Sequence, residues 1–363
     1  MSEFLHAVKP VIRAIEPYHL KDRDFRIKLN QNESPYDLPR NLKKEILAEF
    51  SVLSWNRYPS YTNNKLKEKL AKTLDLDPGQ LLIGNGSNEL LQILISMVLP
   101  PKSKILIVTP TFLIYQQLAE IAEAEIFTLD FDENWQFPVA EILSLLKDKS
   151  ITLTILCSPN SPTGCFLEES DLAQILEAST GLVLLDEAYY EFTQAQYLKL
   201  QGSYENLIVS RTFSKAMGLA GLRIGYFMAR TKLIQELSKA KLPYNLNIFS
   251  EFVASKLLDQ RELLERNVEE IVTEKQKLSV RLQEFQQVTV FQSHANFLMI
   301  ETPFPSAKVF EELHKRGILV RDISNYHPRL ANKLRITVGT PAENQAFKSE
   351  FEAVLADLNK PLS

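Results

Sequence analysis

The chain has 363 residues, of which 45% are hydrophobic and 24% are charged, and its formal net charge at pH 7 is -4. This composition is that of a folded globular protein, and the length favours a large domain with a smaller companion. The slight acidic excess leaves no basic field for nucleic acid, so nucleic acid is not expected as a partner.

Export and membrane insertion are not expected either. The N-terminus, MSEFLHAVKP, lacks the basic and apolar regions of a secretory signal. The most apolar window, 90-LLQILISMVLPP-101, is interrupted by polar residues and is shorter than the roughly 20 residues that a membrane span needs. We therefore expect a cytoplasmic protein with no membrane partner. Cys157 and Cys165 are then expected to be free thiols, and no cluster of residues has the spacing of a metal site.

Residues 1–35 are expected to form an irregular N-terminal arm that ends in 29-LNQNESP-35. Beyond the arm, short apolar runs alternate with helical patterns. The predicted strands are 105–108, 151–157, 182–186, 207–210 and 224–229, and the predicted helices are 41–50, 63–74, 90–98, 113–123, 168–178 and 230–241. Continuous apolar runs suit strands that are buried on both faces. Residues 36–245 are thus predicted to be a large α/β domain, with a mostly parallel sheet covered by helices.

The pattern changes after Pro243 and predicts a smaller α+β C-terminal domain over residues 246–363. A long charged helix is expected over 248–285. The other elements predicted there are strands 288–293, 296–300 and 334–338 and helices 306–317 and 343–358.

Polar loops follow almost every predicted strand of the large domain, and in open parallel sheets such loops converge on one ligand site. In 84-GNGSNE-89, Ser87 and Asn88 begin a helix whose amides could hold a phosphate, although a plain turn explains the same residues better. The stretch matches neither the dinucleotide fingerprint nor the P-loop. This argues against a nicotinamide cofactor or ATP as the ligand.

Two further loops present single polar side chains. In 157-CSPNSPTG-164 two prolines restrain the backbone and can present Asn160 rigidly, as a ligand contact or as part of a plain turn. In 182-LVLLDEAYYEF-192 an apolar strand carries Asp186 into a buried position. A buried carboxylate is costly without a cationic partner, which is either a ligand or a structural salt bridge.

The stretch 210-SRTFSKAMGLAGLRIGYF-227 carries the strongest signal. Thr212, Ser214 and Arg223 supply hydroxyl and guanidinium donors suited to phosphate, and Lys215 lies among them. An amine that is buried near another cation has a lowered pKa and can attack a carbonyl to form a Schiff base. Together with Asp186, this group indicates the chemistry of pyridoxal 5'-phosphate.

In order and type, these motifs resemble those of the pyridoxal-phosphate-dependent aminotransferases of fold type I, and within that family those of histidinol-phosphate aminotransferases. The resemblance runs from LNQNESP at 29 to LRITVGT at 334–340. It implies that the chain moves an amino group between L-histidinol phosphate and 2-oxoglutarate, with glutamate formed in the second half of a ping-pong reaction that serves histidine biosynthesis.

The resemblance also implies roles for individual residues. Lys215 would hold the cofactor and move a proton at the substrate α-carbon, and Asp186 would pair with the protonated ring nitrogen. The other cofactor contacts that it implies are Ser87, Asn88, Thr212, Ser214 and Arg223 at the phosphate, Asn160 and Tyr189 at the phenolic oxygen, and Phe112 at the ring face. Tyr189 is thereby included in the catalytic group.

Substrate and partner contacts follow in the same way. Arg335 would bind the α-carboxylate, and Tyr18, Asn32 and Arg321 would lie on the substrate side. Arg321 is a candidate for the substrate phosphate, against the alternative of an exposed ion pair with nearby acids. Tyr58 would reach the phosphate site of a neighbouring subunit, which implies a homodimer with shared active sites.

Three alternatives stay open. A threonine-phosphate decarboxylase has a similar pattern, although LRITVGT resembles the aminotransferase ending more closely. An aminotransferase for aromatic amino acids would keep the reaction and change the substrate. A non-catalytic regulator that senses pyridoxal phosphate would need a DNA-binding extension, for which the roughly 30 residues before the first motif leave no room.

Overall fold

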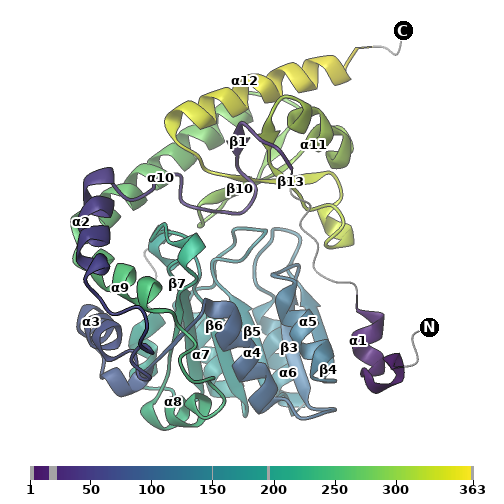
Figure 1. Cartoon of the computed structure of the whole chain (residues 1–363). Helices are drawn as coiled ribbons and strands as arrows, with labels where there is room; N and C mark the ends of the chain where they lie inside the picture. Colours follow the sequence, from purple (N-terminus) through teal and green to yellow (C-terminus); the bar gives the residue numbers. More distant parts are fainter. Residues whose placement is uncertain (1–3, 16–22, 149, 194–196, 361–363) are drawn as a thin grey trace.

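The computed structural model describes residues 4–15, 23–148, 150–193 and 197–360. Its largest sheet has seven strands in the order β2-β8-β7-β6-β5-β3-β4. Figure 1 labels the part of this sheet from β7 to β4. β8 pairs antiparallel with both of its neighbours, and the other pairs are parallel. The strands are β2 (Leu81–Gly84), β3 (Lys104–Thr109), β4 (Glu125–Asp130), β5 (Leu153–Cys157), β6 (Leu182–Asp186), β7 (Leu207–Thr212) and β8 (Gly225–Met228).

Helices cover both faces of this sheet, because successive side chains of a strand point to opposite faces. In β3, Leu106 and Val108 join one core while Ile105 and Ile107 join the other. The first core includes residues of α2 (Arg40–Ser51), α3 (Asn64–Leu74), α6 (Val139–Asp148), α7 (Glu169–Ala178) and α9 (Ile248–Leu257). The second core includes residues of α4 (Ser87–Val98), α5 (Ile114–Ile121) and α8 (Thr231–Ser238).

The C-terminal part of the chain builds a second, smaller layer above the carboxyl ends of the parallel strands (Figure 1). Its four-stranded antiparallel sheet has the order β12-β13-β10-β9, and three helices pack on it around a separate core. These elements are β9 (Thr289–Val290), β10 (Phe297–Glu301), β12 (Arg321–Asp322), β13 (Lys333–Thr337), α10 (Arg261–Gln283), α11 (Ser306–Lys315) and α12 (Pro341–Leu358).

The N-terminal arm is less irregular than expected. It contains α1 (Pro10–Ala14) and β1 (Ile27–Lys28), and β1 pairs in parallel with β11 (Ile318–Leu319). This strand was not predicted because it is only two residues long and is followed by turn-forming residues after position 29. The pairing holds the following residues, 29–33, against the C-terminal layer.

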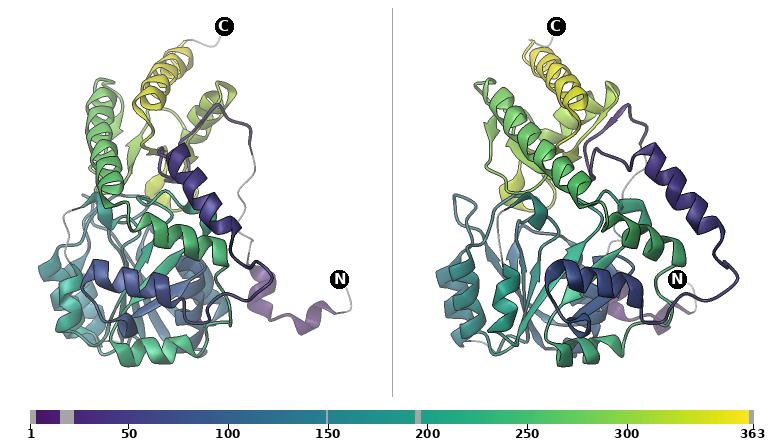
Figure 2. Two further views of the ribbon diagram at one scale, coloured as in Figure 1. Left: turned by 60° about the vertical axis from the view of Figure 1, so that its left-hand side comes forward. Right: turned by 90° about the vertical axis from the view of Figure 1, so that its left-hand side faces the viewer.

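The long helix expected over 248–285 is two helices, α9 and α10, separated at Leu258–Gln260 (Figure 2). Leu257 of α9 is buried against the large sheet. α10 begins against the same core, through Leu263 and Leu264, and ends in the core of the small layer, where Leu278 and Leu282 are buried. Among the described residues, no helix has both the length and the apolar character needed to cross a membrane.

The other strands and helices predicted in the sequence are present, with small shifts at their ends. Besides α1 and β1 of the arm, the elements β2, β4, α6, β11 and β12 were not predicted. β4 lies at the edge of the sheet and has an alternating, partly exposed pattern, so it lacks the continuous apolar run that marked its neighbours. The strand expected over 288–293 is only β9, of two residues. Short 3-10 helices complete the chain at Leu5–Ala7, Pro78–Gln80, Tyr190–Phe192, Tyr197–Gly202, Ala220–Leu222 and Pro328–Leu330.

Candidate active site

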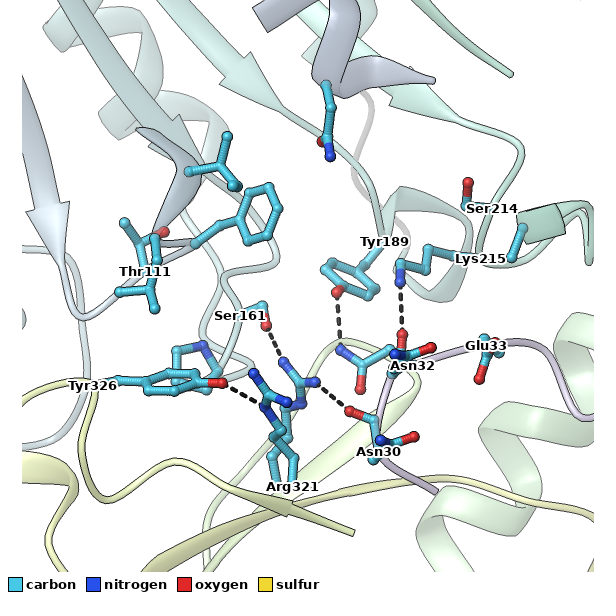
Figure 3. A pocket seen from close by; sticks show the side chains of 18 of the residues that line it. Asn30, Asn32, Glu33, Thr111, Ser161, Tyr189, Ser214, Lys215, Arg321 and Tyr326 are labelled. Atoms are coloured by element: carbon cyan, nitrogen blue, oxygen red, sulfur yellow. Dashed lines mark hydrogen bonds between the residues drawn. The ribbon is translucent and has the colours of Figure 1, made fainter. Parts of the chain in front are cut away.

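A cavity of about 460 Å³ lies between the two layers, where the loops that follow β3, β5, β6 and β7 meet residues 30–33 and the small sheet (Figure 3). This confirms the expectation that the loops at the carboxyl ends of the strands converge. Of the residues that line it, those with polar or aromatic side chains are Asn30, Gln31, Asn32, Glu33, Asn88, Thr111, Phe112, Ser161, Tyr189, Ser214, Lys215, Arg223, Arg321, Tyr326 and Arg335.

Lys215 follows β7 directly and points into this cavity (Figure 3). Its Nζ donates a hydrogen bond to the carbonyl oxygen of Gln31, at 2.8 Å. Burial lowers the pKa of Lys215 to about 7, and the positive charges of Arg335 and Arg223 act in the same direction. Near neutral pH a large part of this amine is therefore uncharged and able to act as a nucleophile.

Hydroxyl and guanidinium donors surround one end of the cavity. Thr212 Oγ1 lies 3.0 Å from Ser214 Oγ, and Arg223 Nη1 donates to Ser214 Oγ at 3.3 Å. Arg223 has a positive φ of 55°. Three of the five residues implied at the phosphate are thus brought together, although Thr212 is not among the residues that line the cavity.

The N-terminus of α4 meets the same group. Gly86 precedes the helix, and a side chain there would place its Cβ 2.6 Å from Arg223 Nη2. A Cβ on Gly225 would lie 2.2 Å from the backbone nitrogen of Ser87. The glycines therefore allow the helix terminus and the guanidinium to approach each other, which makes an anion site of amides and a cation. Asn88 lines the cavity, whereas Ser87 is not among its lining residues.

Asp186 ends β6 below the cavity and is only 4% exposed. Its Oδ2 accepts a hydrogen bond from the Tyr115 hydroxyl at 2.7 Å, and its Oδ1 accepts one from the Ala188 amide at 3.0 Å. Burial raises the pKa of this carboxyl to about 6, although both hydrogen bonds act in the opposite direction. No salt bridge to Asp186 is present among the described residues, so the structural ion pair considered from the sequence is not what balances this carboxylate.

Asn160 and Tyr189 take part in hydrogen bonds at the floor and side of the cavity. The Asn160 amide donates to Pro110 O and to Thr163 Oγ1, each at 2.9 Å, and its Oδ1 accepts from Thr111 Oγ1 at 2.6 Å. Tyr189 OH accepts from Asn32 Nδ2 at 2.9 Å (Figure 3). Asn160 is buried under the loop and is not among the lining residues, whereas Tyr189 is.

Two arginines from the small sheet reach the opposite side of the cavity. Arg335 on β13 donates to Ser161 Oγ and to Asn30 O, each at 2.8 Å. Arg321 on β12 donates from Nε to the hydroxyl of Tyr326, and its guanidinium also lies over that ring (Figure 3). The cavity is therefore cationic both at the phosphate-type cradle and at this second wall.

Phe112 lines the cavity as expected, whereas Thr212, Asp186 and Tyr58, like Ser87 and Asn160, are not among its lining residues. Tyr58 is 81% exposed and stacks on Tyr244 with a ring separation of 4.5 Å, outside the cavity. Tyr18 lies outside the described residues.

The sequence patterns gave no role to several residues at the site, among them Tyr115, Thr111, Ser161 and Tyr326. Tyr115 had a detectable signal, because it follows Phe112 by three positions at the start of a helix and so shares its face. Thr111 and Ser161 could be found only from the folded chain, since their partners, Asn160 and Arg335, come from distant segments. Tyr326 follows its partner Arg321 by five positions.

A mostly parallel sheet with a lysine, an anion cradle and a buried aspartate at its carboxyl edge is the arrangement of transferases that use pyridoxal phosphate. The family model described as aminotransferase class I and II matches residues 26–349. The chain belongs to this family, and the family's enzymes depend on pyridoxal phosphate.

Individual relatives agree with this assignment. A histidinol-phosphate aminotransferase of Chlorobium phaeovibrioides is 37% identical over 356 residues, which is 98% of each chain. The crystal structure of histidinol-phosphate aminotransferase from Sinorhizobium meliloti, in complex with pyridoxal 5'-phosphate, has a TM-score of 0.88, 21% identity and 99% coverage of both chains. An L-threonine-O-3-phosphate decarboxylase from Porphyromonas gingivalis also shares the fold, with a TM-score of 0.79, 22% identity, and coverage of 91% of this chain and 99% of that one.

Proposed function

We propose that the protein transfers an amino group between L-histidinol phosphate and 2-oxoglutarate, with pyridoxal 5'-phosphate as cofactor, in histidine biosynthesis in the cytoplasm. The observation that carries the proposal is one cavity that holds Lys215, an anion cradle and two arginines, Arg321 and Arg335. The 37% identity to a histidinol-phosphate aminotransferase over almost the whole chain supports the choice of substrate.

The residues present fit the cofactor. Thr212, Ser214 and Arg223, with the N-terminus of α4, would hold its phosphate, and Phe112 would contact the face of its ring. The buried Asp186 has two hydrogen-bond donors, Tyr115 and a backbone amide, but no salt-bridge partner among the described residues, as expected of a carboxylate that faces a cationic ring. When bound, the cofactor supplies an electron sink for bonds at the substrate α-carbon.

The protein groups then have separate tasks. Lys215 would hold the cofactor through its neutral amine and, when free, would carry a proton to and from the substrate α-carbon. Asp186 would pair with the positive charge on the ring nitrogen. Tyr189, fixed by Asn32, and Asn160 would contact the phenolic oxygen of the ring.

The second cationic wall suits the two substrates of a ping-pong reaction. Histidinol phosphate carries a phosphate and no carboxylate, whereas glutamate carries two carboxylates. Arg335 is fixed by Ser161 and Asn30 and would bind the α-carboxylate of glutamate. Arg321, fixed by Tyr326, would bind the phosphate of histidinol phosphate.

A panel of amino donors with 2-oxoglutarate tests this assignment. We expect histidinol phosphate to have a higher kcat/KM than histidinol, phenylalanine or threonine phosphate. Replacing Arg321 by alanine should lower kcat/KM for histidinol phosphate roughly 10- to 100-fold and leave histidinol almost unchanged, because a charge-assisted hydrogen bond is lost. A wild-type preference for phenylalanine would contradict the substrate, and carbon dioxide release from threonine phosphate would favour the decarboxylase.

We further propose the three-part division stated from the sequence, with an arm over 1–35, a large domain over 36–245 and a small domain over 246–363, in a homodimer with shared active sites. Large apolar side chains are exposed near the end of α2 and at residues 242–244. They include Trp55 (66%), Tyr58 (81%) and Leu242 (69%), which suits a surface covered by a second copy. Tyr58 would then reach the phosphate cradle of the partner subunit.

Subunit hybrids test the shared site. Lys215→Ala and Tyr58→Ala homodimers should each have little activity. If Tyr58 serves the neighbouring site, a hybrid of the two contains one site with both residues intact, so an equimolar mixture that exchanges subunits should recover about a quarter of wild-type activity. Sedimentation should give the mass of two chains. Recovery no greater than the sum of the separate variants would contradict a shared site.

A further inference from the structure

The buried hydroxyl of Tyr115 has a position that the proposed reaction does not yet use. Tyr115 lies in the first turn of α5 and is 1% exposed, and its OH is 2.7 Å from Asp186 Oδ2. Its ring meets that of Phe112 edge-on, at 5.5 Å and 87°. One short segment thus presents Phe112 to the cavity and a phenol to the carboxylate below it.

The Asp186 carboxylate is held in a defined orientation. The Ala188 amide donates to Oδ1 and Tyr115 donates to Oδ2, so each oxygen has one donor from the protein. Each oxygen still has acceptor capacity for a ligand, because a carboxylate oxygen accepts more than one hydrogen bond. Of the two donors, only the phenol comes from a side chain, and it can be removed without changing the backbone.

We propose that Tyr115 is a positioning residue that keeps Asp186 ionised and directed at the ring nitrogen of the cofactor; this inference rests on the function proposed above. A hydrogen bond donated to a buried carboxylate stabilises its charged form. Since burial disfavours that charge, the loss of the phenol would leave a carboxylate that takes up a proton at higher pH and pairs less well with a cationic ring.

Other titratable groups also face Asp186 and must be separated from this effect. They are the Cys157 thiol on the neighbouring strand, Glu187 next in sequence and Lys215 above. Lys215 would interfere most with a measurement of the ring contact, because it reacts with the aldehyde of pyridoxal phosphate and has a pKa lowered to about 7. Pyridoxamine 5'-phosphate carries the same ring and phosphate but has no aldehyde, so its binding reports the ring contact without attachment to Lys215.

The test is the dissociation constant of pyridoxamine 5'-phosphate between pH 5.5 and 9, for the wild type and Tyr115→Phe. Wild-type binding should weaken as pH falls through the pKa of Asp186, about 6. In Tyr115→Phe the midpoint should move to higher pH, with binding roughly tenfold weaker below it and within about two-fold of the wild type at pH 9. The ratio of the two proteins cancels the titration of the ligand and of Lys215.

Tyr197→Phe is the matched control. Tyr197 is as fully buried, but its hydroxyl contacts Ser158 Oγ and Leu167 O rather than Asp186, so its removal should not move the midpoint. In an Asp186→Asn background, Tyr115→Phe should change the dissociation constant by less than about two-fold, because the residue acts through the carboxylate.

A variant that is expected to shift the pH midpoint in the opposite direction separates this effect from a packing defect. 3-Fluorotyrosine at position 115 keeps the shape and is a stronger donor, so it should move the midpoint to lower pH. An unchanged midpoint, or a loss that is equal at every pH, would overturn the role of Tyr115 and leave the proposed function intact. Failure of the wild type to bind pyridoxamine 5'-phosphate at all would instead reject the proposed function.

Discussion

Lys215→Met is expected to lower the rate of amino transfer by roughly 10⁴-fold or more, because the substitution removes both the attachment of the cofactor and the proton carrier at the α-carbon. Borohydride reduction followed by peptide mass spectrometry should find the cofactor on Lys215 in the wild type and no attached cofactor in the variant. Lys215→Arg should be equally inactive, since arginine keeps the charge but has no neutral amine at working pH.

The pKa of the Lys215 amine makes the rate of cofactor attachment depend on pH. At pH 7 an exposed lysine is neutral in roughly one molecule in three thousand. Lys215 has a pKa lowered to about 7 by burial and by the positive charges of neighbouring residues. The rate of cofactor attachment should therefore rise with pH, reach half of its maximum near pH 7 and level off above about pH 8. A rate that still rises tenfold per unit above pH 8 would contradict the lowered pKa.

Lys275→Met is the matched control for Lys215→Met. Lys275 is also a buried lysine, and burial lowers its pKa to about 8. Its Nζ donates to the carbonyl oxygens of Ser293 and Ala295, and it does not line the cavity. We expect Lys275→Met to lower the melting temperature, because two carbonyls lose their donor, and to retain cofactor attachment. Loss of cofactor attachment in both variants would mean that removing any buried lysine prevents attachment, and it would contradict a specific role for Lys215.

Asp186→Asn is expected to lower kcat by roughly 10²- to 10³-fold, as for other losses of a preorganised charge opposite the reacting group. Asparagine keeps the size of the side chain, so the melting temperature should change little. The physical reason is specific: an amide cannot hold a proton on the ring nitrogen, and a neutral ring is a weak electron sink.

A cofactor analogue separates this explanation from a packing defect. Pyridoxal phosphate with a methyl group on the ring nitrogen has a permanent positive charge and does not need a carboxylate. In Asp186→Ala, which leaves room for the methyl group, the analogue should recover part of the lost rate, whereas in the wild type it should give no gain. Equal activity with both cofactors in the variant would show that Asp186 does not act through the ring charge.

The fold does not discriminate among related activities. A threonine-phosphate decarboxylase shares it at a TM-score of 0.79. The difference must lie in the residues around the α-carbon and in the wall built by Arg321, Arg335, Ser161 and Tyr326. The two arginines of that wall come from the small sheet, and Ser161 comes from a loop of the large layer.

Much of the large layer could be read from the sequence because its signals are local. A strand that is buried on both faces is a continuous apolar run, as in 182-LVLLD-186, and the loop that follows it carries the polar residue that reaches the site. The hydroxyl, lysine and arginine positions lie in one short segment, 212–223, and predicted an anion cradle with an amine. Short, amphipathic or edge elements such as β4 and β1 have no comparable signal, and they were missed.

What only the tertiary structure decided is how distant segments meet. Lys215 donates to the carbonyl of Gln31, which is 184 positions away, and Tyr115 donates to Asp186 across 71 positions. The division of the predicted 248–285 helix into α9 and α10 is likewise seen only in the folded chain. Residue types and local periodicity specify elements and reactive groups, whereas the ionisation and orientation of those groups depend on burial and on hydrogen bonds made across the folded chain.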